Sequence, residues 1–389
     1  MAGALDGVSV LEMSWYASGP YCGRLLALAG ATVTKVERPD GGDPARSFPS
    51  SLFDYLNTGK RSVTLNLKTE EGRDLTERLI AQSDLVVENF SPRVLPGVGL
   101  GFERMQQLNP RVVLVSISNF GQSGPYRDFR SADVVAYALG GLLGIQGEID
   151  KAPLRHWGRQ AQYQAGSIAA VGATAALFHQ RRTGTGQHVD VSLQEAVASL
   201  MESHVEFFTH AGQVRKRSGN RYQWTYPVTL YPCKDGHIVV NAGTPRTWEP
   251  LCTLVGREDL KTDPDYTTSM GRVQRANEID AMLDPWLMAR TRQELWDLAR
   301  QWLLPWGPVN EMGDILRDPQ HVEREYLVSV KQPDGSTVTM PGAPVRLQRT
   351  PLRADQPPPS LGAHNEKVYC GELGLSREAL ETLQANGTV

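Results

Sequence analysis

Two adjacent charged side chains, Glu37 and Arg38, follow a predicted strand and could bind a nucleotide. In dinucleotide-binding units an acidic residue at this place meets a ribose, and a guanidinium can meet a phosphate on that ribose. The loop after the first predicted strand, residues 14–20, reads Ser-Trp-Tyr-Ala-Ser-Gly-Pro and contains no G-x-G-x-x-G motif. Trp15 and Tyr16 stand where a pyrophosphate would need close approach to the backbone. We therefore expect neither a nicotinamide nor a flavin cofactor.

The elements that position this loop alternate between strands and helices over the first 120 residues. A helical pattern over residues 21–29 follows the first strand, and the strand patterns occupy residues 8–13, 31–37, 62–66, 84–88 and 111–116. Short connections between a strand, a helix and the next strand favour a parallel sheet. The pattern predicts an α/β fold with a Rossmann-like large domain.

Beyond Val134 the pattern becomes mainly helical. It is rich in Gly and Ala over residues 163–180, a composition that allows close backbone approach to another element. Ser192 and Glu195 match a capping box, and apolar residues then repeat at helical spacing as far as Phe208. We predict four parts: residues 1–212 in the large domain, a polar and basic linker at 213–225, a small domain at 226–325 that opens with a hairpin over 227–240, and a linker with a C-terminal segment at 326–389.

Composition excludes several classes of function. The 389 residues carry 40 basic and 43 acidic side chains, a net charge of −3, whereas nucleic-acid binding needs an excess of Lys and Arg on one face. No apolar run approaches the ~20 residues of a membrane span, and the N-terminus lacks the pattern of a secretory signal. The four cysteines stand singly, which disfavours a disulfide framework and a zinc site. We expect a cytoplasmic protein without a metal and without membrane or nucleic-acid partners.

Several short motifs, in order along the chain, resemble those of one enzyme family. They are Leu5–Glu12, Gly30–Pro39, Leu65–Lys68, Val87–Phe90, Gly121–Tyr126, Thr183–Ser192, Gly307–Asn310 and Asp318–Gln320. The combination resembles the family III CoA transferases of the CaiB/BaiF type. This group contains formyl-CoA, carnitine-CoA and bile-acid-CoA transferases and the related α-methylacyl-CoA racemases. Each motif is weak alone, but together they are specific.

The resemblance implies a fold and a ligand. The fold is a Rossmann-like large domain completed by the C-terminal segment, with a small α/β domain inserted before that segment, and two subunits interlocked like links of a chain. The ligand is coenzyme A or an acyl-CoA, whose phosphates suit cationic side chains. Transferred position by position, the implied contacts are Ala17, Arg38, Leu65, Asn66, Lys68, Asn89, Phe90 and Arg130.

The position of the family's nucleophile departs from the pattern. Family transferases use an Asp that attacks the acyl-CoA thioester and passes through an anhydride to an aspartyl-CoA thioester. That Asp lies four residues before a Gly, and here Gln162 stands four residues before Gly166. A neutral amide has no anionic oxygen with which to form the anhydride. The racemase branch also needs a His directly before Asp133, where this chain has Ala132.

A second departure concerns CoA itself. Gly97 stands where family members often carry an Arg, and Arg93 lies at the other end of the same loop as a substitute. CoA binding by this chain is therefore an open question at the level of sequence.

Three interpretations remain open. In the first, the chain is the non-catalytic subunit of a heteromeric CoA transferase whose homologous partner keeps the Asp, as in two-subunit transferases of the succinyl-CoA:benzylsuccinate type. In the second, it is an active homodimer that uses another carboxylate, with Glu148 and Asp150 nearest in sequence. In the third, it binds acyl-CoA without being an enzyme. An engineered replacement at residue 162 would also account for the glutamine.

Overall fold

The structure is a computed structural model that describes residues 2–48, 52–332 and 335–389. Contacts divide the chain into two compact units. The first unit comprises the chain up to Leu142, His156–Ala211 and the chain from Pro319 onward, and the second comprises Leu143–Arg155 and Gly212–Asp318. Each unit is described by itself.

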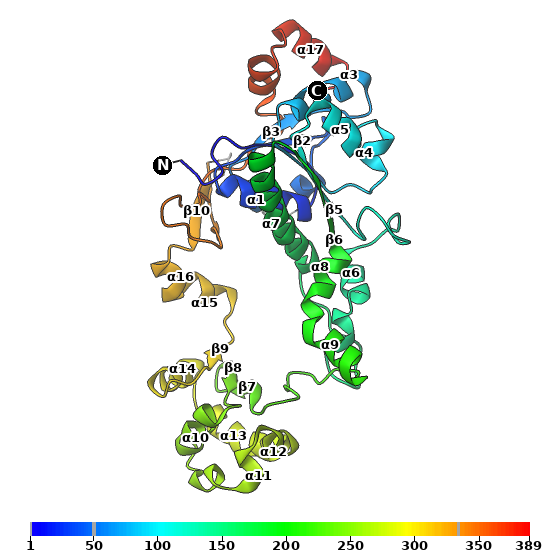
Figure 1. The fold of residues 1–389 in the computed structure, drawn as a ribbon. Helices are drawn as coiled ribbons and strands as arrows, with labels where there is room; N and C mark the ends of the chain where they lie inside the picture. Colours follow the sequence, from blue (N-terminus) through cyan, green and yellow to red (C-terminus); the bar gives the residue numbers. More distant parts are fainter. Residues whose placement is uncertain (1, 49–51, 333–334) are drawn as a thin grey trace. The chain divides into compact units, whose positions relative to one another are not determined.

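A six-stranded parallel sheet forms the centre of the first unit (Figure 1). Its order is β3-β2-β1-β4-β5-β6, and every neighbouring pair is parallel. This is the Rossmann order, in which the strand sequence reverses between β1 and β4 and a crevice opens at their carboxyl ends. The predicted α/β fold is confirmed. The strands are β1 Ser9–Met13, β2 Thr32–Glu37, β3 Arg61–Thr64, β4 Leu85–Glu88, β5 Val113–Ser118 and β6 His188–Ser192.

Helices cover both faces of this sheet (Figure 1). On one face lie α3 and α5 together with α17 of the C-terminal segment, and on the other α1 packs against α7. Gly166 of α7 approaches α1 so closely that a Cβ there would lie 2.6 Å from the Ser18 carbonyl oxygen. The helices are α1 Ser18–Leu28, α2 Leu52–Asn57, α3 Glu70–Ala81, α4 Val94–Gly97, α5 Phe102–Leu108, α6 Asp133–Leu139, α7 Gln160–Thr183, α8 Leu193–Ala198, α9 Glu202–Ala211, α16 Pro319–Glu323 and α17 Arg377–Ala385.

The C-terminal segment returns to the edge of the sheet at β3. His364 donates its backbone N–H to the Ser62 carbonyl (2.9 Å), and the Asn365 side-chain oxygen accepts from the Thr64 N–H (2.9 Å). A π-helical turn over Glu366–Glu372 and then α17 continue from there and bury Val368, Tyr369 and Leu380 in the core of the first unit. A two-stranded hairpin, β10 Leu327–Lys331 and β11 Thr337–Pro341, precedes this segment.

The second unit has its own sheet and its own core. The predicted hairpin is present as β7 (Val228–Cys233) and β8 (Gly236–Asn241), and β9 (Gly307–Pro308) adds a third antiparallel strand. Trp248 and Trp306 are among its buried residues. Its helices are α10 Pro245–Leu254, α11 Pro264–Thr267, α12 Ser269–Gln274, α13 Ala276–Met288, α14 Arg292–Gln301 and α15 Met312–Arg317.

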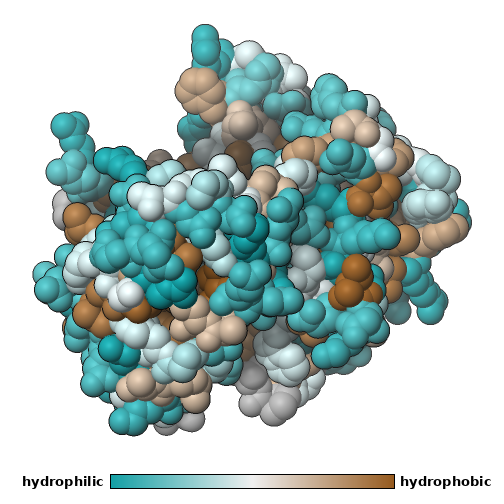
Figure 2. Space-filling view, turned by 90° about the horizontal axis from the view of Figure 1, so that it is seen from below, coloured by the Kyte–Doolittle hydropathy of each residue, from teal (hydrophilic) through white to brown (hydrophobic). Residues whose placement is uncertain are grey.

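The predicted helical face that runs from Ser192 to Phe208 is interrupted. Ser192 caps α8 as expected, accepting a hydrogen bond from the Glu195 N–H, but a 3-10 turn over Ser199–Met201 separates α8 from α9. Phe208 of α9 is 58% exposed. Such side chains stand out singly or in small groups on a surface that is otherwise largely hydrophilic in the view of Figure 2. In the described part of the chain, no helix combines the length and the apolar character needed to cross a membrane.

Candidate functional site

Two pockets of the first unit open where the strands of its sheet end. The larger has a volume of about 730 Å³ and lies beyond β1, β2, β3 and β4. The smaller has a volume of about 190 Å³ and is lined from the ends of β1, β4, β5 and β6. Trp15 and Phe90 line both pockets and contact each other edge to face, with ring centroids 5.4 Å apart. These two rings therefore form a shared wall.

Most of the expected CoA contacts gather around these pockets. Lining the larger pocket are Arg38, Leu65, Asn66, Lys68 and Phe90.

Asn89 and Phe90 line the smaller pocket. Ala17, by contrast, is fully buried at the start of α1, and Arg130 is exposed; neither belongs to the lining of either pocket. Six of the eight residues that the resemblance implies therefore line one or both of these pockets.

The charge available to a ligand in the larger pocket comes from Arg38 and Lys68. The Arg38 side chain is 46% exposed, lies over the Trp15 ring at 5.2 Å and has its nearest acid, Asp40, at 3.8 Å. Lys68 is also exposed. Cations that are only loosely held can turn toward a phosphate.

Glu37 belongs to the lining of the larger pocket, but its carboxylate is bound by other side chains inside the protein. Its carboxylate accepts two hydrogen bonds from the Arg46 guanidinium (both 2.7 Å) and one from the Ser62 hydroxyl (2.6 Å). Burial alone would raise the pKa of Glu37, but these bonds outweigh burial and hold the pKa below its usual range. The carboxylate therefore fixes the end of β2.

Arg93, the expected substitute for the arginine missing at Gly97, pairs with Asp128 in this structure. Its Nε donates to Asp128 at 2.8 Å, and Arg93 is not among the residues that line the larger pocket.

The loop after β1 is held by side chains from other strand ends. The Asn89 amide accepts from the Trp15 N–H (2.9 Å) and donates to the Trp15 carbonyl (2.8 Å) and the Ser18 hydroxyl (3.1 Å). All the hydrogen-bonding groups of that amide are thus engaged in shaping the wall of both pockets. Asn89 supports the site through the loop.

A buried ion network fixes the next residue of the same loop. Tyr16 has a left-handed backbone (φ +64°), and its N–H donates to Asp43 at 3.2 Å. The other Asp43 oxygen lies 2.9 Å from the Lys35 ammonium, which also pairs with Glu12 (2.9 Å) and donates to the Ser14 carbonyl (2.6 Å). Burial disfavours the charge on Lys35, but the two acids outweigh it and raise its pKa. Buried charges need such partners.

Gln162 lies in the smaller pocket, in the first turn of α7. Its backbone N–H donates to Asp133 at 3.1 Å, and Asp133 lines the same pocket. Burial raises the pKa of Asp133, and the backbone hydrogen bonds from α7 partly oppose the rise. Arg127 and Ser118 are further polar residues of this lining.

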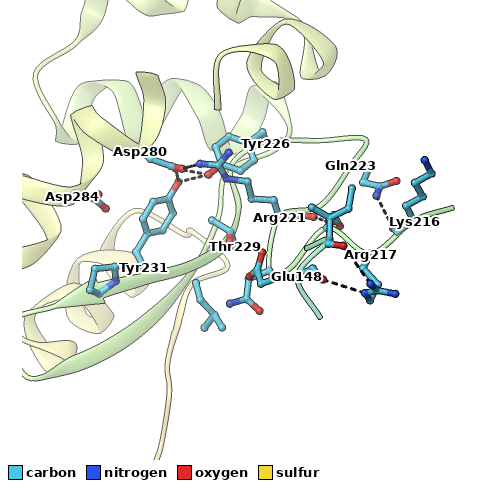
Figure 3. Close-up of a pocket in the computed structure, with 15 residues that line it drawn as sticks. Glu148, Lys216, Arg217, Arg221, Gln223, Tyr226, Thr229, Tyr231, Asp280 and Asp284 are labelled. Atoms are coloured by element: carbon cyan, nitrogen blue, oxygen red, sulfur yellow. Dashed lines mark hydrogen bonds and ion pairs between the residues drawn. The ribbon is translucent and has the colours of Figure 1, made fainter. Parts of the chain in front are cut away.

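The carboxylates considered as replacements for the nucleophile lie in the second unit. Glu148 lines a separate pocket there of about 640 Å³ (Figure 3). In that pocket Asp280 accepts a hydrogen bond from Tyr231 (2.6 Å) and others from Tyr226 and Arg221. Asp150 belongs to the second unit as well. Asp133 is the carboxylate that shares a pocket with Gln162.

The sequence analysis named Asp133 only as the residue after the racemase position and did not identify Arg127, Ser118 or Asp43. Asp133 is the first residue of α6, and an acid at a helix start is a recognisable signal. No sequence motif near Arg127, Ser118 or Asp43 indicates a role for them in a site. Within the described ranges, no group of His, Cys, Asp and Glu side chains could hold a metal ion.

Comparisons with known proteins agree with this geometry. The sequence pattern of CoA-transferase family III matches residues 5–365. The chain is 35% identical to the succinyl-CoA–D-citramalate CoA-transferase of Chloroflexus aurantiacus, covering 99% of this chain and 98% of that relative. It is 31% identical to the succinyl-CoA–L-malate CoA-transferase beta subunit of the same organism, with the same coverage. A crystal structure of a CaiB/BaiF family protein from Brucella suis has a TM-score of 0.86, 30% identity, and coverage of 95% of this chain and 100% of that one.

Proposed function

Because the chain belongs to CoA-transferase family III, we propose that it is the non-catalytic subunit of a heteromeric CoA transferase. A homologous chain would supply the nucleophilic carboxylate, and the complex would move CoA between carboxylic acids. The observation that carries this proposal is Gln162, which stands in the pocket at the position where the family pattern has Asp.

The chemistry of the Gln162 amide supports a site without a nucleophile. Attack on a thioester carbonyl to give an anhydride requires an anionic oxygen, and the Gln162 amide is neutral with a delocalised lone pair. The neighbouring Asp133 already accepts the Gln162 N–H and so caps the start of α7. Only the Oδ1 oxygen takes part in that bond, so Asp133 keeps a second anionic oxygen. Gln162 is therefore unsuited to nucleophilic attack, and Asp133 is the carboxylate in this pocket that an active homodimer would use.

The larger pocket supports CoA binding by this chain. Arg38 and Lys68 provide charge for phosphates, and Leu65 and Phe90 provide apolar walls. Its volume of about 730 Å³ lies in the ~300–1,000 Å³ range of small-molecule sites. We therefore include acyl-CoA among the ligands of this subunit, although the enzyme's chemistry would occur on its partner.

Exposed apolar side chains support a protein partner. On α7, Val171 is 71% and Phe178 is 64% exposed, and on α9 Phe208 is 58% exposed. Val171 and Phe178 are seven residues apart on α7 and so share one face of that helix, and an exposed apolar face is typical of a surface that another chain covers. The beta-subunit relative belongs, by its name, to a transferase of more than one kind of subunit. An interlocked heteromer would use these helices.

The proposal is tested by purifying the tagged chain from its native cells and weighing the complex by native mass spectrometry. We expect a stoichiometric partner of similar mass that has Asp at the position matching Gln162. A homodimer that transfers CoA by itself would contradict the proposal and favour an active enzyme that uses Asp133.

Restoring the carboxylate tests the same site chemically. Gln162→Asp in the isolated chain is expected to raise thioester exchange by roughly 10²-fold or more, because it supplies the missing nucleophile. The matched control is Gln162→Asn, which stays neutral and should stay inactive. Exchange is followed by the transfer of labelled CoA.

A further inference from the structure

The pocket of the second unit contains charged groups that the proposed function does not use. Its volume of about 640 Å³ lies in the ~300–1,000 Å³ range of small-molecule sites. In the view of Figure 3, the α13 acids Asp280 and Asp284 lie at one side of the pocket, and Lys216 and Arg217 lie at the other. The pocket therefore has an acidic end and a basic end.

The acidic end contains one carboxylate without a counter-charge. Asp280 pairs with Arg221. It also accepts hydrogen bonds from the Tyr226 and Tyr231 hydroxyls, so its charge is compensated. Asp284 follows one turn later on α13 and has neither a hydrogen bond nor an ion pair with the residues that the structure describes. Burial, and then the charge of Asp280, raise the pKa of Asp284. An ammonium group beside Asp284 would relieve the repulsion between these two acids.

The basic end has one cation in excess. The Arg217 guanidinium donates to three backbone carbonyls of residues 148–151, at 3.0, 3.1 and 3.3 Å. The Glu148 carboxylate lies against Gly219, where a Cβ would be 2.3 Å from its Oε1. Lys216 is exposed and has no ion pair in the described part of the chain. Two cations and one carboxylate leave a positive charge, which suits an anionic group.

A buried hydroxyl group lies between the two ends in the view of Figure 3. Thr229 of β7 is 8% exposed and lines the pocket, and its hydroxyl has no hydrogen-bond partner among the described residues. The hydroxyl oxygen is not enclosed by protein atoms, so it stays accessible from the pocket. A buried hydroxyl without a partner costs free energy that a polar ligand would recover. Thr229 is therefore a second indication of a ligand, independent of the charges.

We propose that this pocket binds a small molecule of the amino-acid class, with its ammonium group beside Asp284, its anionic group beside Lys216 and its middle against Thr229. A ligand with a single charge would leave one end of the pocket uncompensated. Because the two ends lie at opposite sides of the pocket, a chain of several atoms must separate the two charges of the ligand. The site includes neither Gln162 nor the larger pocket, so this inference does not rest on the proposed function.

The test is a calorimetric titration of the purified full-length chain, with any partner that co-purifies, using 6-aminohexanoate. Two derivatives are matched controls. The N-acetyl derivative keeps the carboxylate and loses the ammonium group, and the amide keeps the ammonium group and loses the carboxylate. We expect saturable binding of 6-aminohexanoate and roughly tenfold weaker binding, or none, of each derivative, because each loses one charge-assisted contact.

Variants locate the binding. Asp284→Asn and Lys216→Gln should each weaken binding of 6-aminohexanoate roughly tenfold, and Thr229→Val, which removes a neutral hydrogen bond, should weaken it roughly threefold. Asp297→Asn and Lys234→Gln remove exposed charges of the same unit outside the pocket, and should leave binding unchanged.

Thermal melting shows whether each variant is folded. Lys216 is exposed, so Lys216→Gln keeps the test informative even if a more buried variant does not fold. Absence of 6-aminohexanoate binding, equal binding of either derivative, or full binding by folded Lys216→Gln would each overturn the proposed site. Those results would leave the proposal of a non-catalytic subunit standing, because that proposal fails only if the chain transfers CoA by itself.

Discussion

At the scale of a single residue, Glu88 links the pocket wall to the interior of the sheet. It ends β4, is 4% exposed, and accepts a hydrogen bond from the Phe90 N–H at 2.8 Å. Burial raises its pKa to about 7, with Asp190 of β6 adding to the rise and the Ser116 hydroxyl and the Phe90 N–H opposing it. The carboxyl group that positions Phe90 thus changes charge near neutral pH.

This pKa predicts how stability depends on pH. Between the ordinary value of 4.5 and about 7, the folded chain keeps a proton on Glu88 that the unfolded chain loses. The free energy of unfolding therefore falls as pH rises through this window, by roughly 3 kcal/mol, and Glu88 adds no further change above it.

Glu88→Gln should remove that fall, because the amide stays neutral and can still accept the Phe90 N–H. Urea denaturation at pH 5, 6, 7 and 8 measures the difference between the two proteins. The exposed Glu381→Gln on α17 is the control for loss of one charge. An unchanged slope in Glu88→Gln would refute the assignment.

Residues also differ in how far the sequence reveals them. Ser192 accepts from the Glu195 N–H as expected, because a helix cap bonds only three residues away, and Thr69 accepts from the Gly72 N–H in the same way. Asp43 bonds a residue 27 positions away. No local sequence pattern indicates a partner at that separation, so the role of Asp43 could be seen only in the structure.

At the scale of elements, the loop after β1 is held from two sides. Asn89 binds it from the end of β4, while Asp43 and Lys35 bind it from β2 and the segment after it. A left-handed backbone is uncommon for an aromatic residue, so Tyr16 keeps it only because its surroundings impose it. The loop that carries Trp15 is therefore held in place by side chains of the strand ends around it.

A double-mutant cycle tests this support. Asp43→Asn should weaken CoA binding roughly tenfold. Without the ion pair to Lys35, the side chain at residue 43 is no longer held in the position in which its oxygen accepts the Tyr16 N–H. In a Tyr16→Gly background the same change should cost less, since glycine adopts the left-handed conformation without strain. Calorimetric CoA affinities of the four proteins measure the coupling, after melting confirms that each is folded. Strictly additive effects would contradict the argument.

At the scale of the whole molecule, the alternation of strand and helix patterns predicted the parallel sheet, and the family resemblance predicted most of the residues that line the larger pocket. It did not indicate that Leu143–Arg155 groups with the second unit. The whole of His156–Ala211 separates that segment from the rest of its unit, and such long-range packing leaves no periodic signal in a short polar stretch.

The core of the second unit predicts that it folds alone. Its buried residues, including Trp248, Leu283 and Trp306, form one closed cluster. All residues of this cluster lie between Tyr226 and Trp306, so a chain of residues 212–318 should unfold cooperatively on heating even without the Leu143–Arg155 segment of the unit. Circular dichroism measures the transition. A gradual change without a midpoint would argue that the unit depends on the remainder of the chain.

The return of the C-terminal segment to β3 has a consequence for aggregation. β3 is an edge strand, and an edge offers free N–H and C=O groups to any other extended chain. Here His364 and Asn365 already occupy the outward groups of Ser62 and Thr64, and the Tyr369 hydroxyl donates to the Thr64 carbonyl at 2.8 Å. When that segment detaches, a strand of another molecule can pair with the exposed edge of β3. The C-terminal segment thus blocks strand pairing between molecules.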